Sequence, residues 1–72
     1  MTFGELRRAA KMTQEQAAEL IEVDMTTIRR WESGQKQPRT KHLERMSEAY
    51  KCDLDTVYSA MNETYSRKGV TV

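Results

Sequence analysis

Hydrophobic residues recur along this chain at spacings of three and four positions, and polar residues fill the positions between them. This spacing is typical of helices that bury one face. It predicts a first helix that runs to about Lys11, a second from Gln14, a third from Met25 to about Ser33, and two more after Thr40 and Asp53. The pattern fades beyond Asn62. We therefore expect an all-α domain of five helices at residues 1–61 and a flexible C-terminal tail at residues 62–72.

Side chains that cap helices stand at the expected boundaries. Thr2 precedes Glu5 by three positions, and Thr13 precedes Gln16 by the same interval. Each pair predicts a capping box, in which two side chains satisfy backbone N–H groups that the first helical turn leaves free. Asp24 is the expected N-cap of the third helix.

The inward-facing positions of the predicted helices share apolar or small side chains, which supply the expected core. These residues are Phe3, Leu6, Ala10, Ala17, Ala18, Ile21, Ile28, Trp31, Leu43, Met46 and Tyr50, with Leu54, Val57, Tyr58 and Met61 on the last helix. Leu20 lies outside this stripe, so we expect it to be exposed. An exposed leucine is a candidate partner contact, although single exposed leucines are common on protein surfaces.

The segment from Met12 to Gly34 predicts two short helices joined by a tight turn, with Gly34 in the left-handed position that ends the second one. The net charge of the whole chain is only +1, but its distribution is uneven. Residues 25–41 carry five basic residues and one acidic residue, whereas the segments before and after them are slightly acidic. Positive charge therefore gathers on the third helix and the following loop. A helix pair of this kind is suited to placing its second helix in the major groove of DNA.

A helical wheel separates the two sides of the third helix. Ile28 and Trp31 point into the core, and Ser33 shares the opposite side with the predicted base-reading residues, which are Met25, Thr26, Arg29 and Arg30. An inserted helix reads bases mainly with its N-terminal half. Arginine can donate two hydrogen bonds to guanine, and threonine or methionine can contact the methyl group of thymine.

Five further residues are expected to bind DNA phosphates: Gln14, Thr27, Lys36, Arg39 and Lys41. Gln14 occupies the first turn of the second helix, where its amide and the free backbone N–H groups can hold a phosphate together. The three cationic residues follow the third helix and could contact the flanking backbone. For each of them the alternative is a purely solubilising role, and Arg39 could instead enter a narrow minor groove.

With these residues placed, the chain resembles the Cro/C1-type helix-turn-helix family, to which the phage lambda and 434 repressors belong. The resemblance runs from about Leu6 to Tyr58, and its most specific parts are Leu6-Arg7, Thr13-Gln14-Glu15, Ala18, Val23, Ile28, Trp31-Glu32 and Gly34. It implies a sequence-specific DNA-binding regulator, usually a homodimer on a palindromic operator, of the repressor type found in phages and mobile elements. It also implies that Gln14 holds a phosphate and that Arg7 and Glu32 form a buried ion pair, the alternative being two separately solvated side chains.

Three positions depart from the family pattern. Glu22 stands where the turn between the second and third helices usually has glycine, and a non-glycine residue with positive φ costs about 1–2 kcal/mol. Ala17 replaces a usual leucine, which implies a thinner core at that point. Met25 replaces a common polar residue, so the first base contact is expected to be apolar.

The expected partner is double-stranded DNA, and the last helix with the residues after it offers apolar surface for a homodimer. The residues concerned are Leu54, Val57, Tyr58, Met61 and Tyr65, which could equally close the core of the monomer. A second hypothesis is a protein-interaction module of the same fold, such as an antitoxin or a subunit that binds another regulator. The nearly neutral net charge keeps this alternative open.

An enzyme is not expected, because the chain has one histidine, one cysteine, no metal-ligand spacing and no glycine-rich phosphate loop. His42 is expected at the surface or near a phosphate. We expect no cofactor, no metal and no membrane segment. Cys52 has no partner for a disulfide, which fits a reducing cytoplasm.

Overall fold

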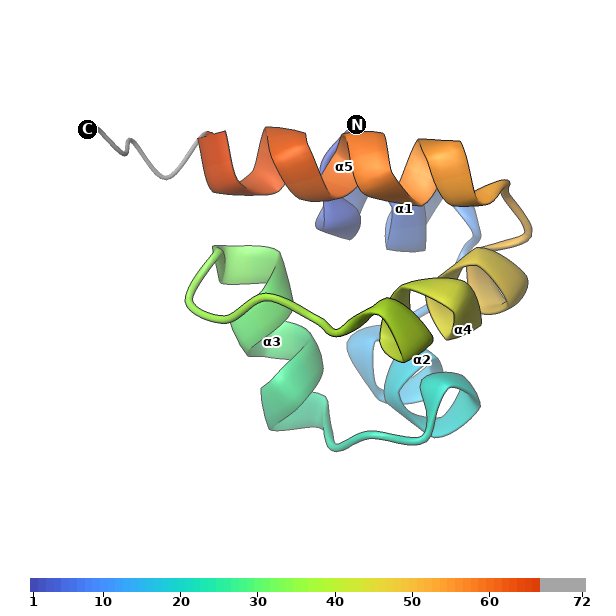
Figure 1. The fold of residues 1–72 in the computed structure, drawn as a ribbon. Helices are drawn as coiled ribbons and strands as arrows, with labels where there is room; N and C mark the ends of the chain where they lie inside the picture. The colour runs from blue at the N-terminus through green and yellow to red at the C-terminus, as the bar shows by residue number, and fades with distance from the viewer. Residues whose placement is uncertain (67–72) are drawn as a thin grey trace.

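The computed structural model describes residues 1–66 of this 72-residue chain, and those residues form five α-helices without a strand (Figure 1). The helices are α1 (Phe3–Ala9), α2 (Gln14–Ile21), α3 (Met25–Ser33), α4 (Thr40–Tyr50) and α5 (Leu54–Ser66). In Figure 1, α5 and α1 lie along one side of the molecule, and α3 and α2 lie on the other. The predicted all-α fold with five helices is confirmed.

Both capping boxes are present, which explains why α1 and α2 begin where they do. The backbone N–H of Glu5 donates to Thr2 Oγ1 at 3.3 Å, and Thr2 N–H donates to Glu5 Oε1 at 2.9 Å. At α2, Gln16 N–H donates to Thr13 Oγ1 at 3.1 Å, and Thr13 N–H donates to Gln16 Oε1 at 2.9 Å. Each N-cap contributes about 0.5–2 kcal/mol of stability. These two helix starts therefore follow from local sequence alone.

Details at three other helix ends differ slightly from the sequence expectation. α1 ends at Ala9 because Lys11 adopts a left-handed conformation with φ of 61°. Asp24 is the N-cap of α3, as expected, but its side chain makes no capping hydrogen bond. The N-cap of α4 is Arg39, one residue before Thr40. Helix ends fray, so such boundaries shift by one or two residues without a change in the fold.

The last helix continues through Ser66, which corrects the expectation of a tail that begins at residue 62. Thr64 is the reason. Its hydroxyl accepts a hydrogen bond from Phe3 N–H at 3.0 Å and donates to the Ala60 carbonyl at 2.7 Å, and the residue is 5% exposed. A polar residue that is satisfied in this way can be buried, so the loss of an apolar pattern does not end the helix. The rest of the expected tail, residues 67–72, lies outside the described residues.

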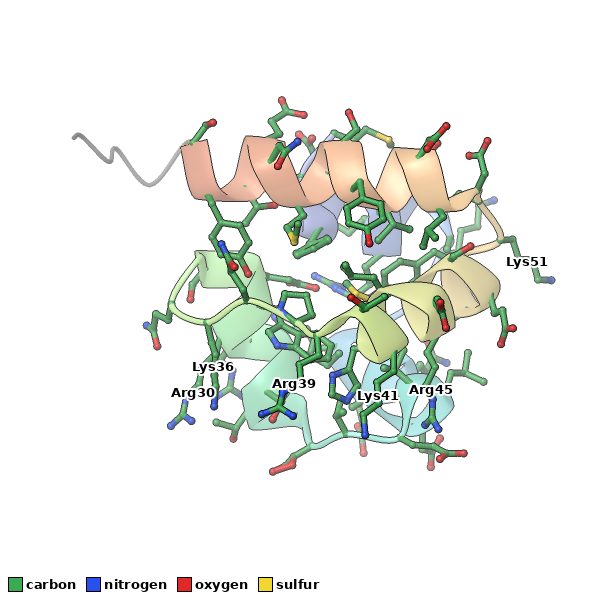
Figure 2. All side chains as sticks on the ribbon, in the orientation of Figure 1. Arg30, Lys36, Arg39, Lys41, Arg45 and Lys51 are labelled. Atoms are coloured by element: carbon green, nitrogen blue, oxygen red, sulfur yellow. The ribbon has the colours of Figure 1, made fainter. Side chains whose placement is uncertain are left out.

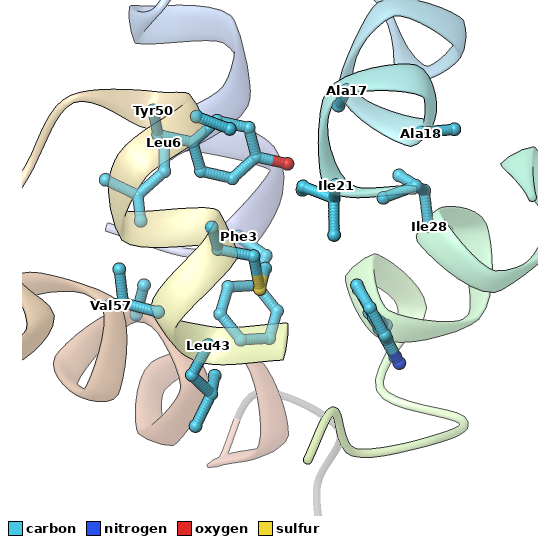
Figure 3. Close-up of a cluster of buried hydrophobic side chains, with 13 residues drawn as sticks. Phe3, Leu6, Ala17, Ala18, Ile21, Ile28, Leu43, Tyr50 and Val57 are labelled. Atoms are coloured by element: carbon cyan, nitrogen blue, oxygen red, sulfur yellow. The ribbon is translucent and has the colours of Figure 1, made fainter. Parts of the chain in front are cut away.

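A single core joins all five helices (Figure 3). Its largest fully buried side chains are Phe3, Ile21, Ile28, Met46 and Val57. Ala17 is also completely buried, so its small side chain brings α2 close to its neighbours. Leu20 is 58% exposed, as its position outside the apolar stripe predicted.

Candidate nucleic-acid interface

The turn between α2 and α3 contains a left-handed glutamate. Glu22 has φ of 69° and ψ of 47°, the conformation expected at this position of the family pattern. Arg45 of α4 supports the turn, since its Nη1 donates to the Ile21 carbonyl at 3.2 Å and to Glu22 Oε1 at 2.9 Å. The Arg45–Glu22 ion pair is largely exposed and therefore contributes little stability by itself. Its hydrogen bond to the carbonyl satisfies a backbone group that the end of α2 leaves without a helical partner.

Helix α3 is anchored by two residues of one face and presents the other face to solvent. Ile28 and Trp31 are 1% and 2% exposed, whereas Arg29 and Arg30 are both exposed. Met25 and Thr26 are exposed as well, in the first turn of the helix. An open hollow of about 320 Å³ is lined by Thr26, Arg29, Arg30, Ser33 and Gln35. The structure therefore brings the four residues predicted to read bases to one accessible side of α3.

The cationic residues after α3 continue this surface. In Figure 2, Arg30, Lys36, Arg39, Lys41 and Arg45 form a row across the lower half of the view, whereas Lys51 lies apart from them at the right. A second hollow, of about 150 Å³, is lined by Thr27, Lys36 and Arg39 together with Trp31, Gln37, Pro38 and His42. Three of the five residues predicted to bind phosphate thus share one hollow, and exposed Lys41 lies in the first turn of α4 beside it.

His42 is one of the residues that line this hollow, and its ring packs against Trp31, a contact that the sequence did not reveal. Its ring lies 5.1 Å from that of Trp31 at an angle of 48° between the planes. Nδ1 is buried and has no hydrogen-bond partner among residues 1–66. Burial lowers the pKa of His42 below 6.5, and the charges of Lys41, Arg45 and Arg39 lower it further. The lowered pKa favours the neutral imidazole.

The predicted ion pair between Arg7 and Glu32 is present beneath the interface. Arg7 Nε donates to Glu32 Oε2 at 2.7 Å and Nη2 donates to Oε1 at 3.2 Å, so the contact is bidentate. Arg7 Nη1 also donates to the Met12 carbonyl at 2.9 Å. The two side chains are 11% and 12% exposed. A pair shielded from water in this way fixes the position of α3 relative to α1.

Gln14 is drawn into the same network. Its Nε2 donates to Glu32 Oε1 at 3.1 Å, a contact that the sequence analysis did not foresee. An amide NH₂ group has two N–H donors, so one remains for another acceptor. Gln14 is partly exposed at the start of α2 and keeps access to solvent.

Other kinds of site have little support within residues 1–66. No group of three or more histidine, cysteine, aspartate or glutamate side chains is placed to hold a metal ion there. Cys52 is a free thiol, and burial, followed by the charge of Asp53, raises its pKa. None of the five helices has the length and apolar character needed to cross a membrane.

A helix pair with an anchored inner face and an exposed cationic outer face defines the class of helix-turn-helix proteins. The helix-turn-helix family profile matches residues 4–57. The chain therefore belongs to the Cro/C1-type helix-turn-helix family, whose members are DNA-binding domains and not enzymes.

One characterised relative adds to this assignment. The chain is 36% identical over 63 residues to the HTH-type transcriptional activator BcrR of Enterococcus faecalis. The aligned region covers 82% of this chain and 31% of that relative, so the chain spans only a minor part of its length. No solved structure matches the chain significantly.

Proposed function

We propose that this chain is a sequence-specific transcriptional regulator that inserts α3 into the major groove of operator DNA. The observation that carries the proposal is that α3 buries two apolar side chains on one face and exposes two arginines on the other. Ile28 and Trp31 are almost fully buried, while Arg29 and Arg30 are exposed beside the hollow on the outer face. A major groove about 12 Å wide admits a helix presented in this manner.

Base reading is assigned to Met25, Thr26, Arg29 and Arg30. The two arginines are exposed, so each can direct its guanidinium to guanine O6 and N7. Met25, 39% exposed, and Thr26 supply methyl groups that suit contact with thymine. The preferred half-site would then combine at least one guanine with a neighbouring thymine.

Phosphate binding is assigned to Gln14, Thr27, Lys36, Arg39 and Lys41. The hollow lined by Thr27, Lys36 and Arg39 supports this role, because it places two cations and a hydroxyl around one space. Lys41 lies in the first turn of α4, where the helix dipole also favours an anion. Gln14 contributes the N–H that Glu32 does not use.

We further propose a homodimer on a palindromic operator. Val57 is completely buried in the monomer core, and Tyr65 packs on Phe3, so both are less available for a dimer. Tyr58, 37% exposed, and the partly buried Leu54 and Met61 remain for the proposed dimer surface. A dimer would set the two copies of α3 about 34–36 Å apart, one turn of DNA.

Resemblance supports two directions of regulation, repression and activation. Phage and mobile-element repressors share this pattern, which supports repression, whereas the relative from Enterococcus faecalis is named as an activator. A regulator of either kind acts on DNA in the cytoplasm. Both outcomes use the same interface, because the direction depends on where the operator lies relative to the promoter.

Selection of bound duplexes from a random pool tests the proposal. The expected result is one enriched motif made of two inverted half-sites, whose centres are separated by one helical turn. The matched control is the Arg29→Ala/Arg30→Ala double variant, which keeps the buried face of α3 and should enrich nothing. A wild-type chain that enriches no motif and whose weak binding ignores salt concentration would favour the protein-interaction module instead.

A further inference from the structure

The end of α5 contacts the loop that leads out of α3. The hydroxyl of Tyr65 donates a hydrogen bond to the backbone carbonyl of Lys36. The ring of Tyr65 packs edge-to-face on Phe3, with 6.3 Å between centroids and an angle of 86°. Burial raises the pKa of Tyr65 to about 12, so the hydroxyl keeps its proton and remains a donor at neutral pH.

Lys36 is thereby held on both sides of its backbone. Its N–H donates to the Arg30 carbonyl at 3.3 Å, and the N–H of Gln35 donates to the same oxygen at 2.9 Å. These bonds close the end of α3, where Gly34 adopts φ of 81°. The carbonyl of Lys36 points the other way, to Tyr65. The backbone of Lys36 thus links the end of α3 to α5.

The segment from Gln35 to Arg39, here called the basic loop, is attached to helices at its two ends. At the second end the Arg39 carbonyl accepts the N–H groups of His42 and Leu43 at 2.9 and 3.0 Å, and Pro38 is buried before it. Lys36 and Arg39 extend from it, exposed, and line the hollow beside Thr27. A flexible loop must lose conformational freedom when its cations meet phosphates, and an ordered loop has already lost that freedom.

We propose that Tyr65 is a positioning residue for the DNA interface, because its hydroxyl fixes the basic loop and so pre-arranges Lys36 and Arg39 for phosphate contact. The inference rests on the proposed function. It assigns a role in DNA binding to a residue outside the sets proposed to contact bases or phosphates. It also means that a change at the end of α5 is transmitted to the interface through one hydrogen bond.

The test compares Tyr65→Phe with Ser59→Ala. The first variant removes the hydroxyl but keeps the ring that packs on Phe3. The second removes a hydroxyl from an exposed side chain of the same helix that has no role in the proposed interfaces. Affinity is measured over a range of salt concentrations for a mixed-sequence duplex of about 20 base pairs, because phosphate contacts need no specific operator. Amide hydrogen exchange of residues 35–39 is measured on the free protein.

Tyr65→Phe should weaken binding about 2- to 10-fold, the range expected for one neutral hydrogen bond. The log–log salt slope should become shallower by up to about 0.9 for each phosphate that the variant no longer neutralises. Exchange in the basic loop should become faster, and Ser59→Ala should match the wild type in all three measurements. A merely structural role for Tyr65 would lower the melting temperature without moving the salt slope.

Three results overturn the inference. If wild type binds the duplex and Tyr65→Phe binds with the same affinity and slope, Tyr65 has no positioning role, while the proposed function stands. If affinity falls but exchange at residues 35–39 is unchanged, the basic loop is not what Tyr65 holds. A wild-type chain that binds no duplex at low salt overturns the proposed function together with this inference.

Discussion

Arg7 holds Glu32 through two hydrogen bonds of 2.7 and 3.2 Å, although the two residues are 25 positions apart. The contact joins α1 to the last turn of α3, and both of its side chains are largely buried. It therefore helps to set the orientation of α3 relative to α1. We expect its removal to lower the stability of the fold as its primary effect, and to affect DNA binding only through that loss.

Arg7→Ala should destabilise the domain by about 3–5 kcal/mol, because it leaves the Glu32 carboxylate buried without its cation. Thermal melting measures the effect. Arg8→Ala is the matched control, since Arg8 is exposed on the same helix and its loss should stay within about 0.5 kcal/mol. Equal melting temperatures for the two variants would show that the ion pair contributes nothing to stability.

Glu22→Gly should stabilise the domain by about 0.5–1 kcal/mol, because glycine adopts a positive φ at lower cost than glutamate. Loss of the exposed pair with Arg45 offsets only a small part of this gain. Chemical denaturation provides the measurement. The control Glu19→Gly, within α2, should instead destabilise by about 1 kcal/mol. A loss of stability in Glu22→Gly would mean that the pair with Arg45 outweighs the backbone strain.

Arg30→Ala should remove discrimination at one base pair of each half-site and weaken specific binding by about 1–3 kcal/mol. The reason is the loss of a guanidinium that can donate two hydrogen bonds to guanine. Affinities for operators substituted at each position in turn measure the effect. An unchanged preference at every position would show that Arg30 reads no base.

Lys36→Ala also removes one positive charge, but from the basic loop, and its effect on DNA binding should differ from that of Arg30→Ala. Binding to all sequences should weaken alike, and the salt slope should become shallower by about one unit. Salt titrations with a specific and a mixed-sequence duplex provide the comparison. A loss restricted to one sequence would assign Lys36 to base reading and not to the backbone.

Acidification should destabilise the domain through His42. Its pKa in the folded state is lowered from the 6.5 expected in the unfolded chain. At a pH between the folded and the unfolded pKa, the unfolded chain therefore binds more protons than the folded one. Stability therefore rises with pH in this window and is lost as pH falls below 6.5. His42 is the only histidine, so melting temperatures measured between about pH 5.5 and 7.5 report mainly on it. His42→Gln should flatten this dependence, and an equally steep dependence in the variant would exclude His42 as its source.

Much of the interface could be predicted from the sequence because helix geometry is local. The positions of Ile28, Trp31, Arg29 and Arg30 on opposite faces follow from 3.6 residues per turn, and the structure places them accordingly. The capping boxes at Thr2 and Thr13 depend on contacts three residues apart, within reach of sequence reasoning. The family pattern predicted the pair of Arg7 and Glu32, which local rules alone cannot.

The remaining features depend on contacts between distant segments. Nothing local indicates that Gln14 meets Glu32, that His42 lies against Trp31, or that Tyr65 reaches Lys36. The same limitation explains why the sequence predicted that the last helix ends near residue 62, whereas α5 continues through Ser66. Thr64 appears polar in the pattern, yet it is buried because Phe3, 61 positions away, supplies its hydrogen-bond donor. The helices and the face that α3 exposes could be predicted from the sequence, since backbone geometry and capping act over a few residues. How the exposed cations are held in place depends on the folded chain, because packing selects which distant side chains meet.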